Sequence, residues 1–219
     1  MKDYYWLNED SVKFLERGYL REGETPEKRI RDIAEAAEKY LKQGGFADKF
    51  EGYMKQGFYS LASPVWSNFG RSRGLPISCN GVYIEDKMHS ILEKQAEVGM
   101  QTKHGSGTSG YFGSLRGRGV PISVGGVSAG AVYFMELFDK VASIVSQGHV
   151  RRGSFAAYLP IDHPDIEEFL RIRSEGNPIQ EMSFAVCIDD DWMQSMVDGD
   201  KDKRKVWANV IKKRFETGY

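Results

Sequence analysis

Apolar residues in the first part of the chain recur at the three- and four-residue spacing of an amphipathic helix. Those that share one helical face are Ile30, Ile33, Ala34, Ala37 and Leu41. The segment Thr25-Pro26-Glu27 is typical of a helix start, because a capping hydroxyl is followed by a proline and an acidic residue. Gly44-Gly45 ends the run. Residues 1–60 are therefore predicted to form a helical N-terminal leader.

After Phe58 the pattern changes to short apolar runs that alternate with longer amphipathic ones. A turn-rich basic segment, Gly70–Pro76, precedes this part of the chain. Strands are predicted at 77–85, 155–159 and 183–188. Helices are predicted at 88–96, with Asp86 as the cap, at 132–145, from 163 to near Gly176, at 191–197 and at 203–215. Strands that alternate with helices indicate an α/β fold with a sheet fed by crossovers, here assigned to residues 61–219.

Composition and charge exclude several classes of protein. The 219 residues are 41% hydrophobic and 28% charged, which is typical of a folded domain and not of a disordered one. The net charge of −1 gives no general case for a nucleic-acid or membrane surface. The start of the chain lacks a signal peptide and no run reaches the roughly 18 apolar residues of a membrane span, so a soluble, cytoplasmic protein is expected.

Cysteine and histidine usage gives no metal site. Cys79 and Cys187 are too few for a disulfide framework, and a lone intracellular cysteine is by default a small buried hydrophobic residue. The histidines lack the spacing of metal ligands; they are His89, His104, His149 and His163. No metal is therefore expected to be bound directly by this chain.

A Gly-rich span, predicted to be a loop from Gly105 to Gly119, contains the pattern G-x-G-x-x-G at Gly105–Gly110. A dinucleotide fold requires a strand before these glycines and a helix after them, whereas here a helical pattern precedes them. A P-loop is excluded because neither Lys-Ser nor Lys-Thr follows Gly110. A nicotinamide-dependent oxidoreductase thus stays only a distant alternative.

Two polar loops are suited to bind anions. Lys103 and His104 enter the Gly-rich span and Arg116 and Arg118 leave it, and glycines allow backbone N–H groups to approach phosphate oxygens. The second loop, Gln147–Gly153, carries two adjacent arginines between glycines. Solvated surface loops would look the same, so from the residues alone both interpretations stay open.

Five motifs in this order resemble the large subunit of class I (aerobic) ribonucleotide reductase, over most of the chain from about Tyr5. They are Leu61-Ala-Ser-Pro-Val-Trp-Ser-Asn, Pro76-Ile-Ser-Cys79 with Asp86 seven residues later, Lys103 with Arg116, Gln147-Gly-His-Val-Arg-Arg-Gly, and His163-Pro-Asp-Ile-Glu-Glu-Phe-Leu. The resemblance implies a helical leader followed by the first half of a ten-stranded α/β barrel. It also implies reduction of ribonucleoside diphosphates to deoxyribonucleoside diphosphates for DNA synthesis, under allosteric control by nucleotides.

The same resemblance implies roles for individual residues. Cys79 would be one of two thiols that reduce the ribose 2′ carbon and end as a disulfide. The expected substrate-binding residues are Ser63, Ser78, Gly107 and Arg151, the last on a loop that passes effector identity to the substrate. The expected effector-binding residues, for a deoxynucleoside triphosphate or ATP, are Asp86, Lys87, Met88, Lys103 and Arg116.

The resemblance further implies what this chain would need from elsewhere. The radical cysteine and the partner thiol of Cys79 would follow Tyr219, and the ATP cone of many relatives is expected to be absent. The implied partners are the remaining C-terminal part of the large subunit, a metal-containing small subunit that supplies the radical, a second large subunit, and a reductant of the thioredoxin or glutaredoxin type. A non-catalytic nucleotide-binding module is the alternative interpretation.

Overall fold

The computed structural model describes residues 4–72, 74–145 and 153–218, so the predicted substrate residue Arg151 lies outside the described residues. The chain divides into two compact units between Ser78 and Cys79. The sequence patterns place the change at residues 60–61, whereas in the structure one more helix, α4 (Ser63–Asn68), belongs to the first unit. The two units are described separately.

The first unit consists of helices, as the sequence predicts. They are α1 (Glu9–Glu16), α2 (Pro26–Leu41), α3 (Phe46–Lys55) and α4. The side chain of Thr25 accepts a hydrogen bond from the Lys28 N–H at 3.2 Å, which confirms the predicted start of α2. The helix ends at Leu41, and Lys42 in the left-handed conformation turns the chain before the two glycines.

Arg29 of α2 is the one buried arginine among the described residues of this helical unit, and it ties α2 to α4. Its side chain is 2% exposed and donates to the carbonyl oxygens of Val65, Trp66 and Phe69 at 3.1, 2.8 and 2.8 Å. The last carbonyls of a helix lack partners within the helix, so Arg29 supplies donors that α4 needs at its C-terminal end. The apolar core around this contact contains Ile30, Ile33, Met54 and Trp66.

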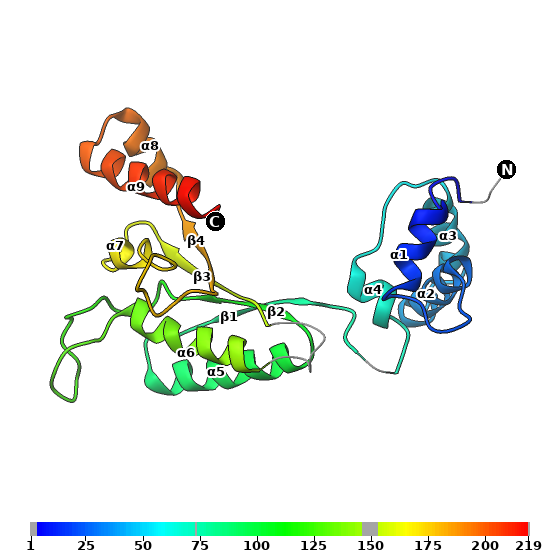
Figure 1. Ribbon diagram of the computed structural model, residues 1–219, viewed down its shortest axis with the longest axis horizontal. Coiled ribbons are helices and arrows are strands. Elements are labelled where there is room, and N and C mark those ends of the chain that lie inside the picture. The colour runs from blue at the N-terminus through cyan, green and yellow to red at the C-terminus, as the bar shows by residue number, and fades with distance from the viewer. Residues whose placement is uncertain (1–3, 73, 146–152, 219) are drawn as a thin grey trace. The chain divides into compact units, whose positions relative to one another are not determined.

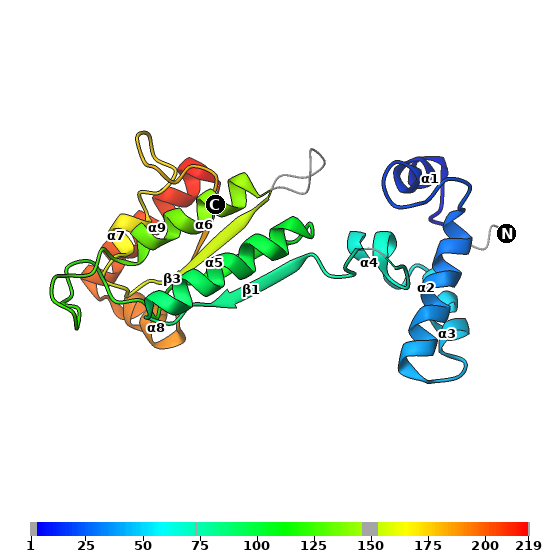
Figure 2. The same ribbon diagram turned by 90° about the horizontal axis from the view of Figure 1, so that it is seen from below.

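The second unit is a parallel α/β layer. Its elements are β1 (Cys79–Tyr83), α5 (Met88–Lys103), β2 (Gly107–Tyr111), α6 (Ala131–Ile144), β3 (Phe155–Pro160), α7 (Ile166–Phe169), β4 (Ser183–Cys187), α8 (Asp190–Asp198) and α9 (Lys201–Thr217). The sheet order is β1-β2-β3-β4 and each neighbouring pair is parallel. Both views show α5 and α6 side by side along one face of the sheet (Figure 1, Figure 2). The predicted helical leader followed by a parallel α/β part is confirmed.

Alternation along the strands separates the two faces of the sheet. Val82, Phe155 and Leu159 point to the α5–α6 layer and are at most 6% exposed, together with Phe112 and Phe138 in the same core. The opposite face, called the open face below, carries the alternate residues. These are Cys79, Gly81 and Tyr83 on β1, Gly107, Ser109 and Tyr111 on β2, Ala156, Tyr158 and Pro160 on β3, and Ser183, Ala185 and Cys187 on β4.

Two local predictions were wrong. The Gly-rich span is not a continuous loop, because Gly107–Tyr111 forms β2 between β1 and β3. A Cβ at Gly110 would lie 2.9 Å from the Phe155 ring, so this glycine serves close packing in the core. Asp86 does not cap α5, since the cap position is Lys87 and its side chain makes no capping bond. The carboxylate of Asp86 instead accepts hydrogen bonds from Arg116.

Candidate functional site

The parallel sheet divides the predicted site residues between two edges, named here by the strand ends that lie there. Cys79 and Gly107 are the first residues of β1 and β2 and lie at the amino edge. Asp86 and Arg116 follow the ends of the same strands and lie at the carboxyl edge. Strands of five residues separate these edges by roughly 13 Å or more.

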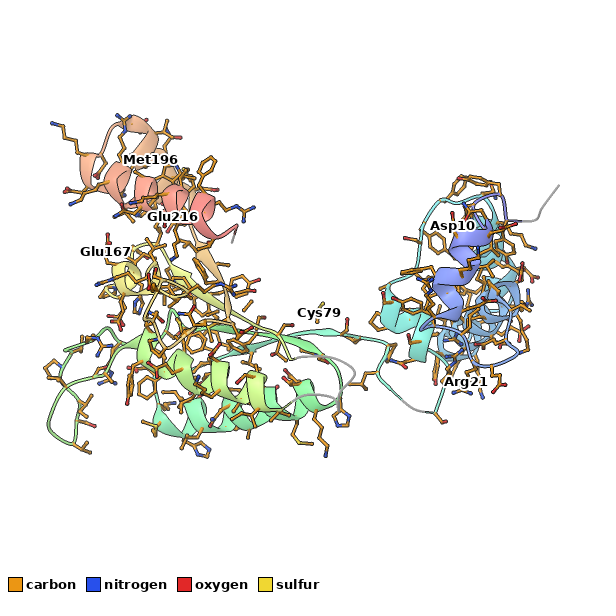
Figure 3. All side chains as sticks on the ribbon, in the orientation of Figure 1. Asp10, Arg21, Cys79, Glu167, Met196 and Glu216 are labelled. Carbon is orange, nitrogen blue, oxygen red and sulfur yellow. The ribbon has the colours of Figure 1, made fainter. Side chains whose placement is uncertain are left out.

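At the amino edge the Cys79 thiol is accessible to a ligand. It is exposed, it lies on the open face at the start of β1, and its register partner on β2 is Gly107 (Figure 3). Because Gly107 carries no side chain, the space beside the sulfur on the open face stays clear of β2 side chains. The structure thus brings Cys79 and Gly107 together, with Ser78 directly before Cys79 in the chain.

Next to Cys79 the open face carries residues with small side chains or none, and a row of tyrosines follows them along the strands. Gly81 and Ser109 are register partners one row on, and a Cβ at Gly81 would lie 3.2 Å from the Ser109 hydroxyl. The following row contains Tyr83, Tyr111 and Tyr158, of which the first two rings stack with centroids 5.8 Å apart. The sequence interpretation missed this tyrosine row, although the period-two alternation of β1 and β3 is a signal for it.

The second cysteine lies elsewhere on the same face. Cys187 ends β4 at the carboxyl edge, in register with Pro160, and both cysteines are free thiols. Burial raises the pKa of the Cys187 thiol, which disfavours the reactive thiolate. Burial also raises the pKa of Tyr111, and the nearby Cys187 adds to that shift. This environment supports the structural role that the sequence indicates for Cys187.

Ser63, a predicted substrate-binding residue, belongs to the helical unit. It begins α4, and its hydroxyl accepts a hydrogen bond from Tyr19 at 3.3 Å. It lines a cavity of about 930 Å³, to which six aromatic residues contribute: Tyr5, Trp6, Phe14, Tyr19, Tyr59 and Trp66. Ser63 therefore lies in an open cavity of the helical unit, whereas Cys79 and Gly107 lie in the second unit.

At the carboxyl edge Asp86 and Arg116 form an ion pair. The guanidinium Nε donates to the Asp86 carboxylate at 2.6 Å, and the Arg116 backbone N–H donates to the same carboxylate at 3.4 Å. Nη1 donates to the Pro121 carbonyl at 3.2 Å, which fixes the orientation of the guanidinium group. Both side chains are about one-third exposed, so the pair borders solvent and is within reach of a ligand.

Two further predicted effector residues flank this pair at the start of α5. Lys87 forms an ion pair with Glu85 at 2.9 Å, which lowers the pKa of that carboxyl group. Met88 is the first residue of α5 and is 55% exposed. A pair of charged groups beside an exposed thioether offers polar contacts for a sugar and phosphates and an apolar contact for a base.

Lys103 does not join this group within one chain. It ends α5, which places it about 22 Å along the helix from Met88. Thirteen residues separate Lys103 from Arg116 in the sequence, but the chain runs the length of β2 in between. The structure therefore brings together four of the five predicted effector residues and leaves Lys103 at the amino edge.

The segment from Arg116 to Gly130 is a hairpin that projects from the carboxyl edge next to α6 (Figure 1, green). Gly119 N–H donates to the Ser128 carbonyl at 2.9 Å, Ser128 N–H donates to the Val120 carbonyl at 2.8 Å, and Pro121 and Val127 form an antiparallel bridge. Val124 at its tip is 89% exposed. This segment is called the hairpin loop below.

Within the described residues, no group of three histidine, cysteine or acidic side chains is arranged to hold a metal ion. Over the same residues, every helix is too short or too polar to cross a lipid bilayer.

Comparisons with known proteins agree with the geometry. Residues 77–215 match the family described as "Ribonucleotide reductase, barrel domain". The structure of an Actinobacillus ureae class Id ribonucleotide reductase alpha subunit is similar with a TM-score of 0.87 and 52% identity, over 99% of this chain and 40% of that one.

Curated relatives are more distant in sequence. A "Putative ribonucleoside-diphosphate reductase large subunit" of Frog virus 3 (isolate Goorha) is 29% identical over 83% of this chain and 34% of its own length. A "Vitamin B12-dependent ribonucleoside-diphosphate reductase" of Mycobacterium tuberculosis (strain CDC 1551 / Oshkosh) is 29% identical over 80% of this chain and 26% of its own length. The chain spans about a third or less of the length of these two relatives.

Proposed function

This chain belongs to the ribonucleotide reductase family, and from that premise we propose that it is part of a large subunit that reduces ribonucleoside diphosphates to deoxyribonucleoside diphosphates. The observation that carries the proposal is the placement of Cys79 on the open face, exposed and beside Gly107. The class I assignment, in which a separate metal-containing small subunit supplies the radical, is supported by the similarity to a class Id alpha subunit.

The chemistry assigned to this chain is one half of a two-electron reduction. Removal of the ribose 2′ oxygen requires two electrons, and two thiols deliver them when they join as a disulfide. Cys79 is proposed as one of these thiols, and the other is proposed to lie in the remainder of the large subunit. Cys187 is not a suitable partner, because it lies at the other edge of the sheet, on β4, and because burial raises the pKa of its thiol.

The substrate is proposed to lie over the small side chains next to Cys79. Gly81 and Ser109 leave room for a sugar on the open face, and the tyrosine row closes that room on the side of the carboxyl edge. Ser63, Ser78 and Arg151 stay predicted substrate-binding residues. A dithiol reductant of the thioredoxin or glutaredoxin type would return Cys79 and its partner to thiols after each turnover.

The effector, a deoxynucleoside triphosphate or ATP, is proposed to bind at Asp86 and Arg116. The Asp86 carboxylate already orients the guanidinium, and Nη2 of Arg116 contacts no acceptor among the described residues, so it can donate to a phosphate. Lys103 lies too far along α5 to share that phosphate within one chain. A homodimer in which a second copy contributes Lys103 is the arrangement proposed here.

The test is reduction of CDP in the presence of ATP, a small subunit and a dithiol. This chain is assayed with and without the polypeptide that completes it; the joined protein is called the completed large subunit below. Turnover only when the second polypeptide is present is the expected result. If no combination turns over while the chain still binds dTTP, the reductase proposal fails, and a non-catalytic nucleotide-binding module replaces it.

A further inference from the structure

The His163-Pro164-Asp165 turn between β3 and α7 holds both ends of the hairpin loop. Asp165 is 5% exposed and His163 is 6% exposed. One carboxylate oxygen of Asp165 accepts from the Arg118 backbone N–H at 2.8 Å, and the other accepts from the Ala131 backbone N–H at 2.7 Å. A single buried side chain therefore joins Arg118, near the start of the hairpin loop, to Ala131, which directly follows its end.

His163 binds the backbone of the segment that leads into the hairpin loop, at Leu115. Its Nδ1 accepts from the Asp165 backbone N–H at 3.1 Å. That bond leaves Nε2 as the protonated nitrogen, which donates to the Leu115 carbonyl at 2.8 Å. Leu115 directly precedes Arg116, so the histidine fixes the backbone from which the proposed phosphate-binding arginine projects.

Two glycines make this close approach possible. A Cβ at Gly117 would lie 2.7 Å from Pro164, and a Cβ at Gly130 would lie 2.7 Å from the Asp165 carboxylate. Gly130 also has a φ of 91°, a backbone conformation that residues with a side chain rarely adopt. Backbone conformation and contact distance therefore both depend on the absence of a side chain at Gly130.

The same turn is connected to the predicted substrate loop. Helix α6 leads from Ala131, at the Asp165 contact, to the residues before 147–153, and β3 leads from the end of that loop back to the turn. At the far end Gly153 is packed against α6, since a Cβ there would lie 2.3 Å from the Ala142 carbonyl. The bond between Asp165 and Ala131 thus closes one end of a helix–strand pair whose other end carries residues 147–153.

We propose that Asp165, oriented by His163, is a positioning residue that sets the geometry of the effector-binding hairpin loop and thereby its affinity for nucleotide. The inference rests on the proposed function. It assigns a task to the His163–Leu170 motif, which the proposed catalytic and effector contacts leave without one.

The experiment compares the completed large subunit with its Asp165→Asn variant, assembled with the small subunit. Asparagine has one acceptor oxygen where aspartate has two, so either Arg118 or Ala131 loses its partner. The ATP concentration for half-maximal CDP reduction and the dissociation constant for dTTP are expected to rise about tenfold or more, with the rate at saturating ATP retained. A defect of folding alone would lower that maximal rate and leave the half-saturating concentration unchanged.

Glu168→Gln is the matched control, because Glu168 on α7 binds the exposed side chain of Arg118 at 2.6 and 2.9 Å and not the backbone of the hairpin loop. It is expected to change the two constants by less than about threefold. Unchanged constants in Asp165→Asn, or a lower maximal rate with unchanged constants, would overturn the inference while the proposed function stands. If the parental enzyme binds no dTTP, the effector assignment fails and the inference falls with it.

Discussion

Replacement of Gly130 by alanine tests whether the Asp165 contact holds the hairpin loop in place. Gly130 has φ 91° and ψ 162°, a region in which a residue with a side chain is strained by about 1–3 kcal/mol. The added Cβ would also lie 2.7 Å from the Asp165 carboxylate and 2.9 Å from Arg118 Cβ, so the carboxylate must move away from the Ala131 N–H. A hydrogen bond to a charged acceptor contributes about 1.5–3 kcal/mol, so strain and the lost bond together should lower the local free energy of opening by roughly 2.5–6 kcal/mol.

Gly125→Ala is the matched control within the same hairpin loop. Gly125 also has a positive φ, 86°, but no heavy atom lies within 4 Å of its added Cβ. Its cost is therefore backbone strain alone, about 1–2 kcal/mol, and the effect should be confined to the tip.

Amide hydrogen exchange of the completed large subunit measures both variants. Exchange at Arg118 and Ala131 should quicken by about a hundredfold or more in Gly130→Ala, up to the limit set by global unfolding, and change little in Gly125→Ala. If the two variants quicken exchange at these amides equally, backbone strain explains the result and the argument for the Asp165 contact is refuted.

Three further predictions concern the sites and the core. Arg116→Ala should weaken dTTP binding by about tenfold or more in calorimetric titration, whereas Lys94→Ala, which removes a partly exposed ion pair with Glu97 on α5, should leave that affinity unchanged. Equal effects of the two substitutions would remove the phosphate assignment. Cys79→Ser should abolish dithiol-supported CDP reduction with unaltered dTTP affinity, whereas Cys187→Ser should keep most of the turnover; loss of dTTP binding in the first variant would identify Cys79 as structural. Asp139 is 4% exposed, and burial is the main cause that raises the pKa of its carboxyl group. The folded state therefore holds this proton more tightly than the unfolded state, and the stability of the protein falls as the pH rises through the folded-state pKa. Asp139→Asn should raise the melting temperature at pH 7, with a gain that shrinks as the pH falls towards 4, and a gain that is the same at every pH would contradict this reasoning.

Elements with a regular apolar pattern could be predicted from the sequence, and the Gly-rich strand could not. The helix predicted after Thr25 and the strand predicted at 155–159 lie within a residue of α2 and β3, because their own apolar side chains enter the core. β2 lacks such a pattern, since three of its five residues are glycine or serine. It is extended because β1 and β3 pair with it on both sides, and this pairing is a property of the sheet.

The division of the candidate site between two edges also depends on the sheet. Because β1 and β2 are parallel, the residues that follow them meet at one edge, which brings Asp86 to Arg116 across thirty positions of sequence. Lys103 is closer to Arg116 in the sequence but precedes β2, so it lies at the opposite edge with Cys79 and Gly107. The resemblance to the reductase family identified these residues as candidates, and strand direction decided which of them meet.

The His163–Leu170 motif shows most clearly why the role of a motif cannot be inferred from the sequence alone. Nothing in the local sequence distinguishes Asp165 from an ordinary acidic residue near a helix start, where carboxylates are common. Its two partners are 47 and 34 positions away, and both are backbone N–H groups, which no side-chain pattern can signal. Only Gly117 and Gly130 mark the contact in the sequence, because each must lack a side chain for the turn to approach. The glycines around the hairpin loop, which as sequence suggest phosphate contacts, thus also serve the contact that holds the loop, and a loop held at both ends can present Arg116 to a nucleotide at a defined position.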